Sequence, residues 1–436
     1  MPSLFVLNAI FMRTLNFLFI SAISLASCSD MSFRYDIQTG NKSYSKPQSM
    51  SADRMARIDT MIIKSIRENV IPGAVALVLK DGEVVYEKAW GVSNPETGSV
   101  YSSDDIFRIA SMTKAITSVA ILMLWEEGRF FLDDPIEKYL PAFSGTGILE
   151  SYEPNDSSYT TTPNQTKITI RHLLTHTSGI GYSDIDVNPS IKAIYWKNGL
   201  TDIFSPSLTM KEAAKEIARQ PLHHEPGTKF TYSLGIDVLG SLVEEISGMS
   251  FADFLSERIF KPLNMNNTYF NLPKKDQNRL VPVLTRDDQE WKIFETEVYD
   301  VDYPIMEEKT FFSGGAGLSS TIGDYAKFLR VLIQDGNGNN KQILGKKTCE
   351  LLYENQLRGI EDWSLGIATG IMSEKDLYQG GRGSVGTLTW GGYFNTIYFA
   401  DPEEKIIGLL FKQTQNIGND YTSQRFRELV FQSVVK

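Results

Sequence analysis

Apolar residues recur every three or four positions in several stretches of the chain, which is the spacing of a helix with one buried face. Between residues 53 and 69 the apolar positions are Met55, Ile58, Met61, Ile62 and Ile66. The same spacing predicts helices at 110–128, 208–220, 233–246 and 421–436. The helix at 110–128 is apolar enough that we expect it to be buried, and Gly128 marks its end.

Strands are predicted near both ends of the chain. Residues 72–80 and 83–91 are rich in β-branched side chains and flank Asp81-Gly82, a pair of residues that favours a tight hairpin. Residues 387–413 predict two or three antiparallel strands with a turn at Asp401-Pro402-Glu403.

This order of elements indicates an α+β or α/β fold. Its antiparallel sheet would combine N- and C-terminal segments, flanked by helices, with a helical lobe inserted between them. We expect the sheet lobe to comprise about residues 54–105 and 315–436, and the helical lobe about residues 106–314. Within the helical lobe, residues 144–167 are polar and rich in turn-forming residues, which predicts a surface loop.

The N-terminal segment resembles an export signal rather than a fold element. Residues 14–27 form a short apolar run behind a basic residue and end in small residues. Leu25-Ala26-Ser27-Cys28 also fits the bacterial lipobox, in which the cysteine is acylated. We therefore predict a lipoprotein-type signal peptide at 1–27, a lipid anchor at Cys28, a tether at 28–53, and a location in the bacterial cell envelope. An ordinary signal peptide with an incidental cysteine is the alternative.

Composition excludes several classes of protein. The chain has 436 residues and a net charge of −10, which argues against a nucleic-acid partner because such proteins normally present a basic face. Two cysteines exclude a disulfide scaffold and a cysteine-rich zinc module. If Cys28 is lipidated, Cys349 is left alone, and we expect it to be a small buried side chain.

Ser111-Met112-Thr113-Lys114 places a hydroxyl and an amine on the same face of a predicted helix. Serine is a weak nucleophile that needs a neighbouring base, and a desolvated lysine can be that base. Two other Ser-x-x-Lys matches begin at Ser43, in the predicted tether, and at Ser433, at the chain end. Only Ser111 opens a helix that must be buried, with N-terminal amides available to a developing oxyanion.

Two further segments carry candidate chemistry. Tyr232 lies in Phe230-Thr231-Tyr232-Ser233-Leu234-Gly235, and a tyrosine beside a lysine can share proton transfer because the cation favours its phenolate. The alternative is a tyrosine that only packs in the core. Trp390-Gly391-Gly392 places two glycines in a predicted strand, which indicates either a close approach of backbone or ligand, or a bulge.

Other matches are weaker. His172 and His176 have the spacing of helical zinc ligands, but the glutamate of the His-Glu-x-x-His motif is absent, so we expect them to cap and pack a helix end. Gly248-Met249-Ser250-Phe251-Ala252 lacks the final glycine of a nucleophile elbow. No metal site is predicted.

Together these sites resemble the serine β-lactamase-like hydrolases, the penicillin-recognising group, and in particular the class C β-lactamases and family VIII carboxylesterases. The resemblance runs from about residue 54 to the C-terminus and implies a β-lactamase/transpeptidase-like fold. The segments that carry it are FRIASMTKAITSVAILML, ITIRHLLTHTSG, FTYSLGIDVLG, FFSGGAGLSSTIGDYAKFL and WGGYFNTIYFADPEE.

The resemblance implies a role for each matching residue. Ser111 would be the nucleophile that forms an acyl-enzyme, and Lys114 would take and return its proton. Tyr232 would act with the lysine as general base and then as acid. The oxyanion hole would consist of the backbone N–H groups of Ser111 and Tyr393. This chemistry requires no cofactor.

Two residues depart from the β-lactamase pattern. Leu234 stands where those enzymes usually have asparagine, and Trp390 stands where they have the lysine that binds a substrate carboxylate. Both changes resemble the carboxylesterase branch, whose motif is Trp-Gly-Gly. We therefore expect Trp390, Gly391, Gly392 and Leu234 to contact a neutral substrate, although Arg382 could supply a replacement cation.

The sequence thus predicts a serine hydrolase that acts through an acyl-enzyme on a small ester or amide, most simply a carboxylic ester. One alternative is a β-lactamase or D-alanyl-D-alanine carboxypeptidase of the same fold. An alternative of another class is a non-catalytic binding protein of the cell envelope. The sequence does not indicate an oligomeric state.

Overall fold

The computed structural model describes residues 38–39, 49–200, 208–306, 309–367, 369–377 and 380–435. The predicted signal peptide, Cys28 and most of the predicted tether lie outside these residues. Gln38–Thr39, from the predicted tether, forms the short strand β1, which pairs with β3.

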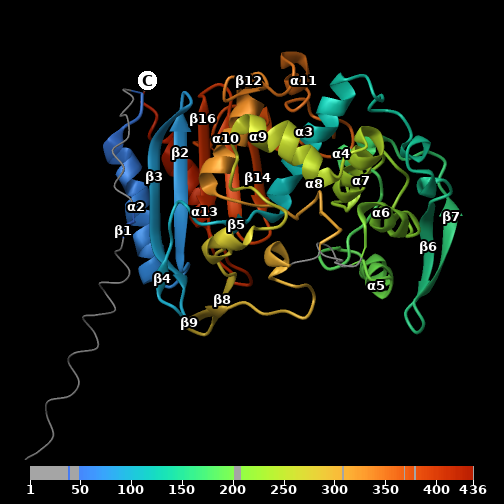
Figure 1. Ribbon diagram of the computed structural model, residues 1–436, viewed down its shortest axis with the longest axis horizontal. Coiled ribbons are helices and arrows are strands. Elements are labelled where there is room, and N and C mark those ends of the chain that lie inside the picture. Colours follow the sequence, from blue (N-terminus) through green and yellow to red (C-terminus); the bar gives the residue numbers. More distant parts are fainter. Residues whose placement is uncertain are drawn as a thin grey trace, which may run out of the picture.

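An antiparallel sheet forms one side of the molecule, with strand order β1-β3-β2-β16-β15-β14-β13 and β4 attached to β3 (Figure 1). Its other strands are β2 (Gly73–Lys80), β3 (Glu83–Asn94), β4 (Ser99–Val100), β13 (Gly370–Ile371), β14 (Leu388–Gly392), β15 (Thr396–Asp401) and β16 (Ile406–Phe411). N-terminal and C-terminal strands meet where β2 pairs with β16. The predicted fold class is therefore confirmed.

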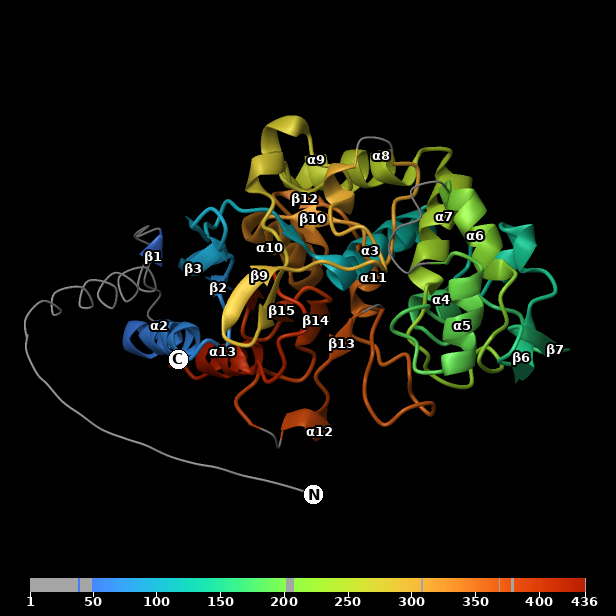
Figure 2. The same ribbon diagram turned by 90° about the horizontal axis from the view of Figure 1, so that it is seen from below.

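The helices cover the sheet and build a lobe beside it. They are α2 (Ala52–Arg67), α3 (Thr113–Glu126), α4 (Ile170–Leu174), α5 (Pro189–Lys197), α6 (Met210–Ala218), α7 (Gly235–Ser247), α8 (Phe251–Leu255), α9 (Lys261–Leu263), α10 (Ile322–Ile333), α11 (Lys346–Glu350), α12 (Glu374–Leu377) and α13 (Thr422–Phe431). Figure 2 shows α2 and α13 together against one face of the sheet, and α4 to α7 in the lobe beyond α3.

β2 joins the two hydrophobic cores. All eight of its residues are buried, and successive side chains point to opposite faces of the sheet. Leu77 packs in the large core that contains α3, whereas Val78 packs in the smaller core beneath α2 and α13. The turn to β3 has positive φ at both Asp81 (53°) and Gly82 (82°), as a tight hairpin requires, so the predicted hairpin is confirmed.

α3 is the buried helix that the apolar pattern predicts. Twelve of its residues are buried, from Thr113 to Leu124, and the chain leaves the helix before Gly128, whose φ is +71°. α3 packs against α7, and Figure 2 shows it between the sheet and the lobe of α4 to α7, so the helix that carries Lys114 lies inside the molecule.

The prediction of a surface loop at 144–167 is wrong. Residues Gly147–Glu153 (β6) and Ser158–Pro163 (β7) form an antiparallel hairpin at the outer end of the helical lobe (Figure 1). Every residue of β7 is exposed, so the hairpin lacks the alternation of apolar and polar residues by which a half-buried strand is recognised. Its β-branched threonines were the available signal.

Three further strand pairs are short. They are β5 (Phe107–Arg108) with β10 (Ser319–Ser320), β8 (Leu284–Asp287) with β9 (Glu290–Ile293), and β11 (Asn337–Gly338) with β12 (Lys341–Gln342). β5 and β10 matter for the site, because β5 ends three residues before Ser111.

Cys349 is buried, as expected, with 1% of its surface exposed. Burial raises the pKa of its thiol to about 12. Over the ranges described above, the helices are too short or too polar to cross a membrane.

Candidate active site

Ser111 lies in a single turn of 3-10 helix, Ala110–Met112, that leads into α3. Ala110 has φ +42°, a left-handed conformation that is uncommon for a residue with a side chain and that stores strain in the backbone. The preceding residue is anchored, because the Ile109 N–H donates to the Leu318 carbonyl at 3.1 Å. The backbone thus holds Ser111 in one conformation, with its side chain half-buried.

Lys114 is completely buried one turn further along. Its Nζ donates to Ser111 Oγ at 3.3 Å, to the Tyr182 hydroxyl at 3.1 Å and to the Gly315 carbonyl at 2.8 Å. An ammonium group has three N–H donors, so these partners satisfy all of them. Burying an ammonium group is costly unless its donors are satisfied, and here each donor has a partner.

Tyr232 approaches from the segment before α7. Its hydroxyl donates to Ser111 Oγ at 2.7 Å, and its ring centroid lies 4.5 Å from Lys114 Nζ. The three residues singled out in the sequence therefore meet. Both Lys114 and Tyr232 contact Ser111 Oγ. Whichever of the two gives up a proton then has a free lone pair within reach of the serine hydroxyl and can accept the serine proton.

Tyr182 is a site residue that the sequence reasoning missed. Besides accepting a hydrogen bond from Lys114, its ring stacks on that of Tyr232 with centroids 5.4 Å apart and planes at 20°. A single tyrosine in a loop carries no periodic or motif signal. Gly315 was also missed as a partner of Lys114, because it contributes only a backbone carbonyl, and a backbone contact has no residue-type signal in the sequence.

The two histidines with zinc-like spacing have separate places. His172 forms the capping box of α4: its Nδ1 accepts the Thr169 N–H at 3.2 Å, and its own N–H donates to Thr169 Oγ1 at 3.2 Å. This confirms the expected helix cap. His176 is fully buried against the ring of Tyr232, with centroids 4.7 Å apart.

The end of β14 lies against the turn that carries Ser111. A Cβ atom on Gly392 would lie 2.4 Å from the Ile109 carbonyl oxygen and 2.3 Å from Thr396 Oγ1. Real Cβ atoms do not approach so closely, so only glycine lets the strand end here. The close approach of two backbones, one of the expected alternatives, is what the structure shows at this position.

A small cavity of about 30 Å³ opens beside Ser111. Its lining residues are Ser111, Tyr182, Asp184, Ile185, Tyr299, Ala316 and Tyr393. The two residues expected to supply the oxyanion hole, Ser111 and Tyr393, thus border the same space. Burial raises the pKa of Tyr299 well above its usual value, with a further contribution from Tyr393, so this phenol is neutral at physiological pH.

Of the other residues predicted to contact the substrate, some lie near the site and others do not. The Trp390 ring centroid lies 6.1 Å from that of Tyr232, close to the site. Leu234, by contrast, is only 4% exposed and packs in the large core, so it does not line the cavity. Arg382 is paired with Glu428 of α13 at 3.1 Å, so its charge is engaged by α13 and it is not among the cavity residues.

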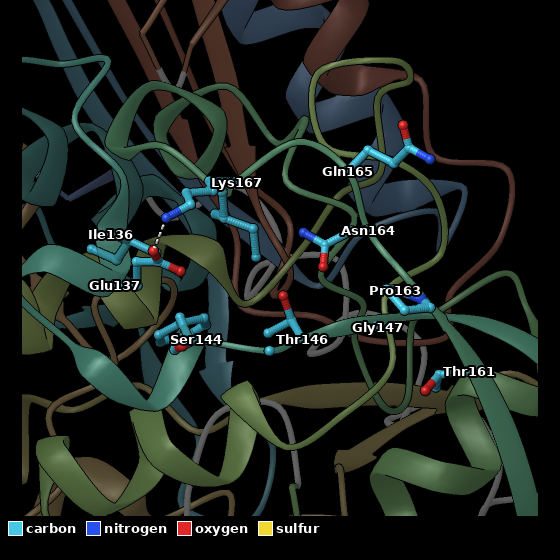
Figure 3. Close-up of a pocket in the computed structure, with 13 residues that line it drawn as sticks. Ile136, Glu137, Ser144, Thr146, Gly147, Thr161, Pro163, Asn164, Gln165 and Lys167 are labelled. Atoms are coloured by element: carbon cyan, nitrogen blue, oxygen red, sulfur yellow. Dashed lines mark hydrogen bonds and ion pairs between the residues drawn. The ribbon is translucent and has the colours of Figure 1, made fainter.

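A larger hollow of about 480 Å³ lies elsewhere, between the segment 136–147 and the segment 161–168, which comprises the end of β7 and the residues after it (Figure 3). It is mostly polar, and Lys167 forms an ion pair with Glu137 across it. It shares no residue with the cavity at Ser111, and it is not the site of the chemistry described above.

Comparisons with known proteins bear on the family and the fold. The family model described as Beta-lactamase matches residues 54–430. Esterase EstB of Burkholderia gladioli is 29% identical over 84% of this chain and 91% of its own length. A putative D-alanyl-D-alanine carboxypeptidase of Escherichia coli K12 is 26% identical over 89% of this chain and 88% of its own. The solved structure of EstCE1, a hydrolase with promiscuous acyltransferase activity, has the same fold (TM-score 0.73, 24% identity, 87% and 99% coverage).

Gly392→Ala tests the close approach of β14. We expect the new methyl group to displace the Ile109–Ser111 turn and to slow labelling of Ser111 by a fluorophosphonate by on the order of 100-fold, because displacements of about 1 Å have effects of this size. Gly391→Ala is the matched control, since a Cβ there would lie 3.2 Å from its nearest neighbour, the Thr396 carbonyl oxygen. Equal labelling rates in the two variants would contradict the argument.

Proposed function

Because this chain belongs to the β-lactamase family, we propose that it is a serine hydrolase that cleaves neutral carboxylic esters through an acyl-enzyme on Ser111. The observation that carries the proposal is the convergence of two proton-transfer groups on one hydroxyl. Lys114 Nζ lies 3.3 Å and the Tyr232 hydroxyl 2.7 Å from Ser111 Oγ. This is the arrangement that an activated serine requires.

The proposed reaction has two halves. In the first, the Lys114–Tyr232 pair accepts the proton of Ser111 while Oγ attacks the ester carbonyl carbon. The resulting oxyanion lies between the backbone N–H groups of Ser111 and Tyr393. The same pair then returns the proton to the departing alcohol, which leaves the acyl group on the serine. In the second half a water molecule takes the place of the alcohol and releases the acid.

Preformed donors explain why the backbone must be rigid here. An oxyanion-hole donor contributes about 3 kcal/mol to stabilisation of the transition state, provided that it is already aimed at the developing charge. Two observations support this proposal: Ala110 has a strained backbone, and Gly392 lets the end of β14 approach the Ile109 carbonyl beside the Ser111 turn.

The charges around the site favour a neutral ester over a substrate that carries a carboxylate. Trp390 stands where a cation would hold a substrate carboxylate, and the residues that line the cavity include one acidic residue, Asp184, and no lysine or arginine. Arg382 is engaged by Glu428. The name of the Burkholderia relative is that of an esterase, which supports the same conclusion.

The name of the Escherichia coli relative supports the alternative of a D-alanyl-D-alanine carboxypeptidase. That substrate ends in a carboxylate. Trp390 in place of a cation, and the acidic Asp184 on the cavity wall, therefore argue against it. The contacts among Ser111, Lys114 and Tyr232 argue against a non-catalytic binding protein, because binding alone would not require a buried lysine beside the serine.

Ser111→Ala removes the proposed nucleophile. We expect the hydrolysis of p-nitrophenyl acetate to fall at least ~1000-fold, since loss of the nucleophile removes the acyl-enzyme route. Ser118→Ala is the control, because it removes a serine hydroxyl from α3, the helix that follows Ser111, and should leave the rate within about twofold. Full activity in Ser111→Ala would reject the assignment.

The charge argument predicts substrate selectivity. We expect kcat/KM for a neutral p-nitrophenyl ester to exceed that for an ester whose acyl chain ends in a carboxylate by about tenfold or more. Asp184→Asn should narrow this ratio, chiefly by improving the anionic ester, whereas Asp287→Asn, at an exposed surface position, should not. A preference for the anionic ester in the wild-type protein would instead favour the peptidase alternative.

We further propose that Cys28 carries a lipid that anchors the protein in the cell envelope, as the lipobox indicates. In a bacterial host we expect the wild-type protein to sediment with membranes and Cys28→Ser to appear in the soluble fraction. Two signals are usually needed for stable anchoring, and the several acyl chains of a bacterial lipoprotein satisfy that requirement. Identical fractionation of the two proteins would contradict lipidation.

A further inference from the structure

We propose that His176 is a positioning residue that holds Tyr232 within reach of Ser111. This inference rests on the proposed function of Ser111, Lys114 and Tyr232, and it gives a role to a histidine that the reaction itself does not use.

His176 binds the residues on both sides of Tyr232. Its carbonyl accepts the Thr231 N–H at 2.8 Å, and its Nδ1 accepts the Ser233 N–H at 3.2 Å, with Ser233 Oγ also at 3.1 Å. One histidine therefore fixes the backbone just before and just after the tyrosine. This leaves the phenol little freedom to move away from the serine.

The imidazole also contacts the phenol directly. The rings of His176 and Tyr232 have centroids 4.7 Å apart and planes inclined at 40°. Tyr182 stacks on the same phenol at 5.4 Å. Tyr232 is thus restrained both through its backbone and through its ring, while its hydroxyl points to Ser111 Oγ.

The chemistry of histidine suits this role. The Ser233 N–H donates to Nδ1, so Nδ1 must be the unprotonated nitrogen of a neutral ring. Burial, with the Lys114 cation as a second cause, lowers the pKa of His176 well below its usual range, so the ring stays neutral at physiological pH. A neutral ring keeps its acceptor and adds no second positive charge beside Lys114.

Two further features argue against a residue that merely fills space. His176 has φ +55°, a conformation that an apolar β-branched residue would resist. Its Nε2 atom is buried and has no hydrogen-bond partner among the described residues, which costs free energy. An apolar side chain would avoid that cost, but it would lose the acceptor for Ser233.

His176→Asn and His176→Gln form a matched pair that tests the proposal. The amide of asparagine reaches about the position of Nδ1 and asparagine tolerates positive φ, whereas glutamine places its amide near the position of Nε2. We expect His176→Asn to keep kcat for p-nitrophenyl acetate within about fivefold of wild type. We expect His176→Gln to lower kcat on the order of 100-fold, with KM changed less than about threefold.

A double-mutant cycle separates positioning from a general structural effect. If His176 acts through Tyr232, His176→Gln should lower kcat less than about threefold once Tyr232→Phe has removed the hydroxyl. The same 100-fold loss in both backgrounds would overturn the proposal. His172→Gln is the control in the wild-type background, because it affects the α4 cap and not the tyrosine.

Crystal structures of the two variants give a readout that does not depend on turnover. We expect the distance from the Tyr232 hydroxyl to Ser111 Oγ to stay near 2.7 Å in His176→Asn and to exceed hydrogen-bond range in His176→Gln. An unchanged distance in both variants would reject positioning even if activity falls. If the wild-type protein hydrolyses no ester but the Tyr232–Ser111 distance still increases in His176→Gln, the positioning role stands and the proposed function is rejected.

Discussion

The burial of the Lys114 ammonium is the constraint on which the rest of the site depends. A cation without water must have every N–H donor satisfied. Here the acceptors are a serine, a tyrosine and a backbone carbonyl from three separate parts of the chain. Folding α3 into the core therefore requires Ser111, Tyr182 and Gly315 to converge, and the same convergence assembles the chemistry.

A second buried lysine shows what is particular about the first. Lys412 is equally inaccessible, but it forms an ion pair with Asp420, which also accepts from Asn395 Nδ2 at 2.8 Å. That network holds the turn after β14, two residues beyond Tyr393. Removing a proton from Lys412 would leave a buried carboxylate without its cation. The three hydrogen-bond partners of Lys114, by contrast, are a serine hydroxyl, a tyrosine hydroxyl and a backbone carbonyl, and none of them is a carboxylate.

Much of the fold could be predicted from local patterns. The hairpin at Asp81-Gly82, the buried helix α3 and the C-terminal strands, of which two or three were expected, are runs rich in apolar residues that end at recognisable turns. The β6–β7 hairpin was missed because it is largely exposed, with every residue of β7 in contact with solvent, so it has no regular alternation of apolar and polar residues. Periodicity reports burial, and an element without a buried face leaves no trace in it.

The sequence by itself determined which side chains could carry the chemistry, because a serine and a lysine three positions apart share a helix face wherever that helix lies. Only the tertiary structure decided that Tyr232 meets them, that Tyr182 and His176 support it, and that Leu234 packs in the core instead. These outcomes depend on contacts between residues far apart in the chain. Such contacts arise from packing and hydrogen bonding across the whole fold, which no local pattern encodes.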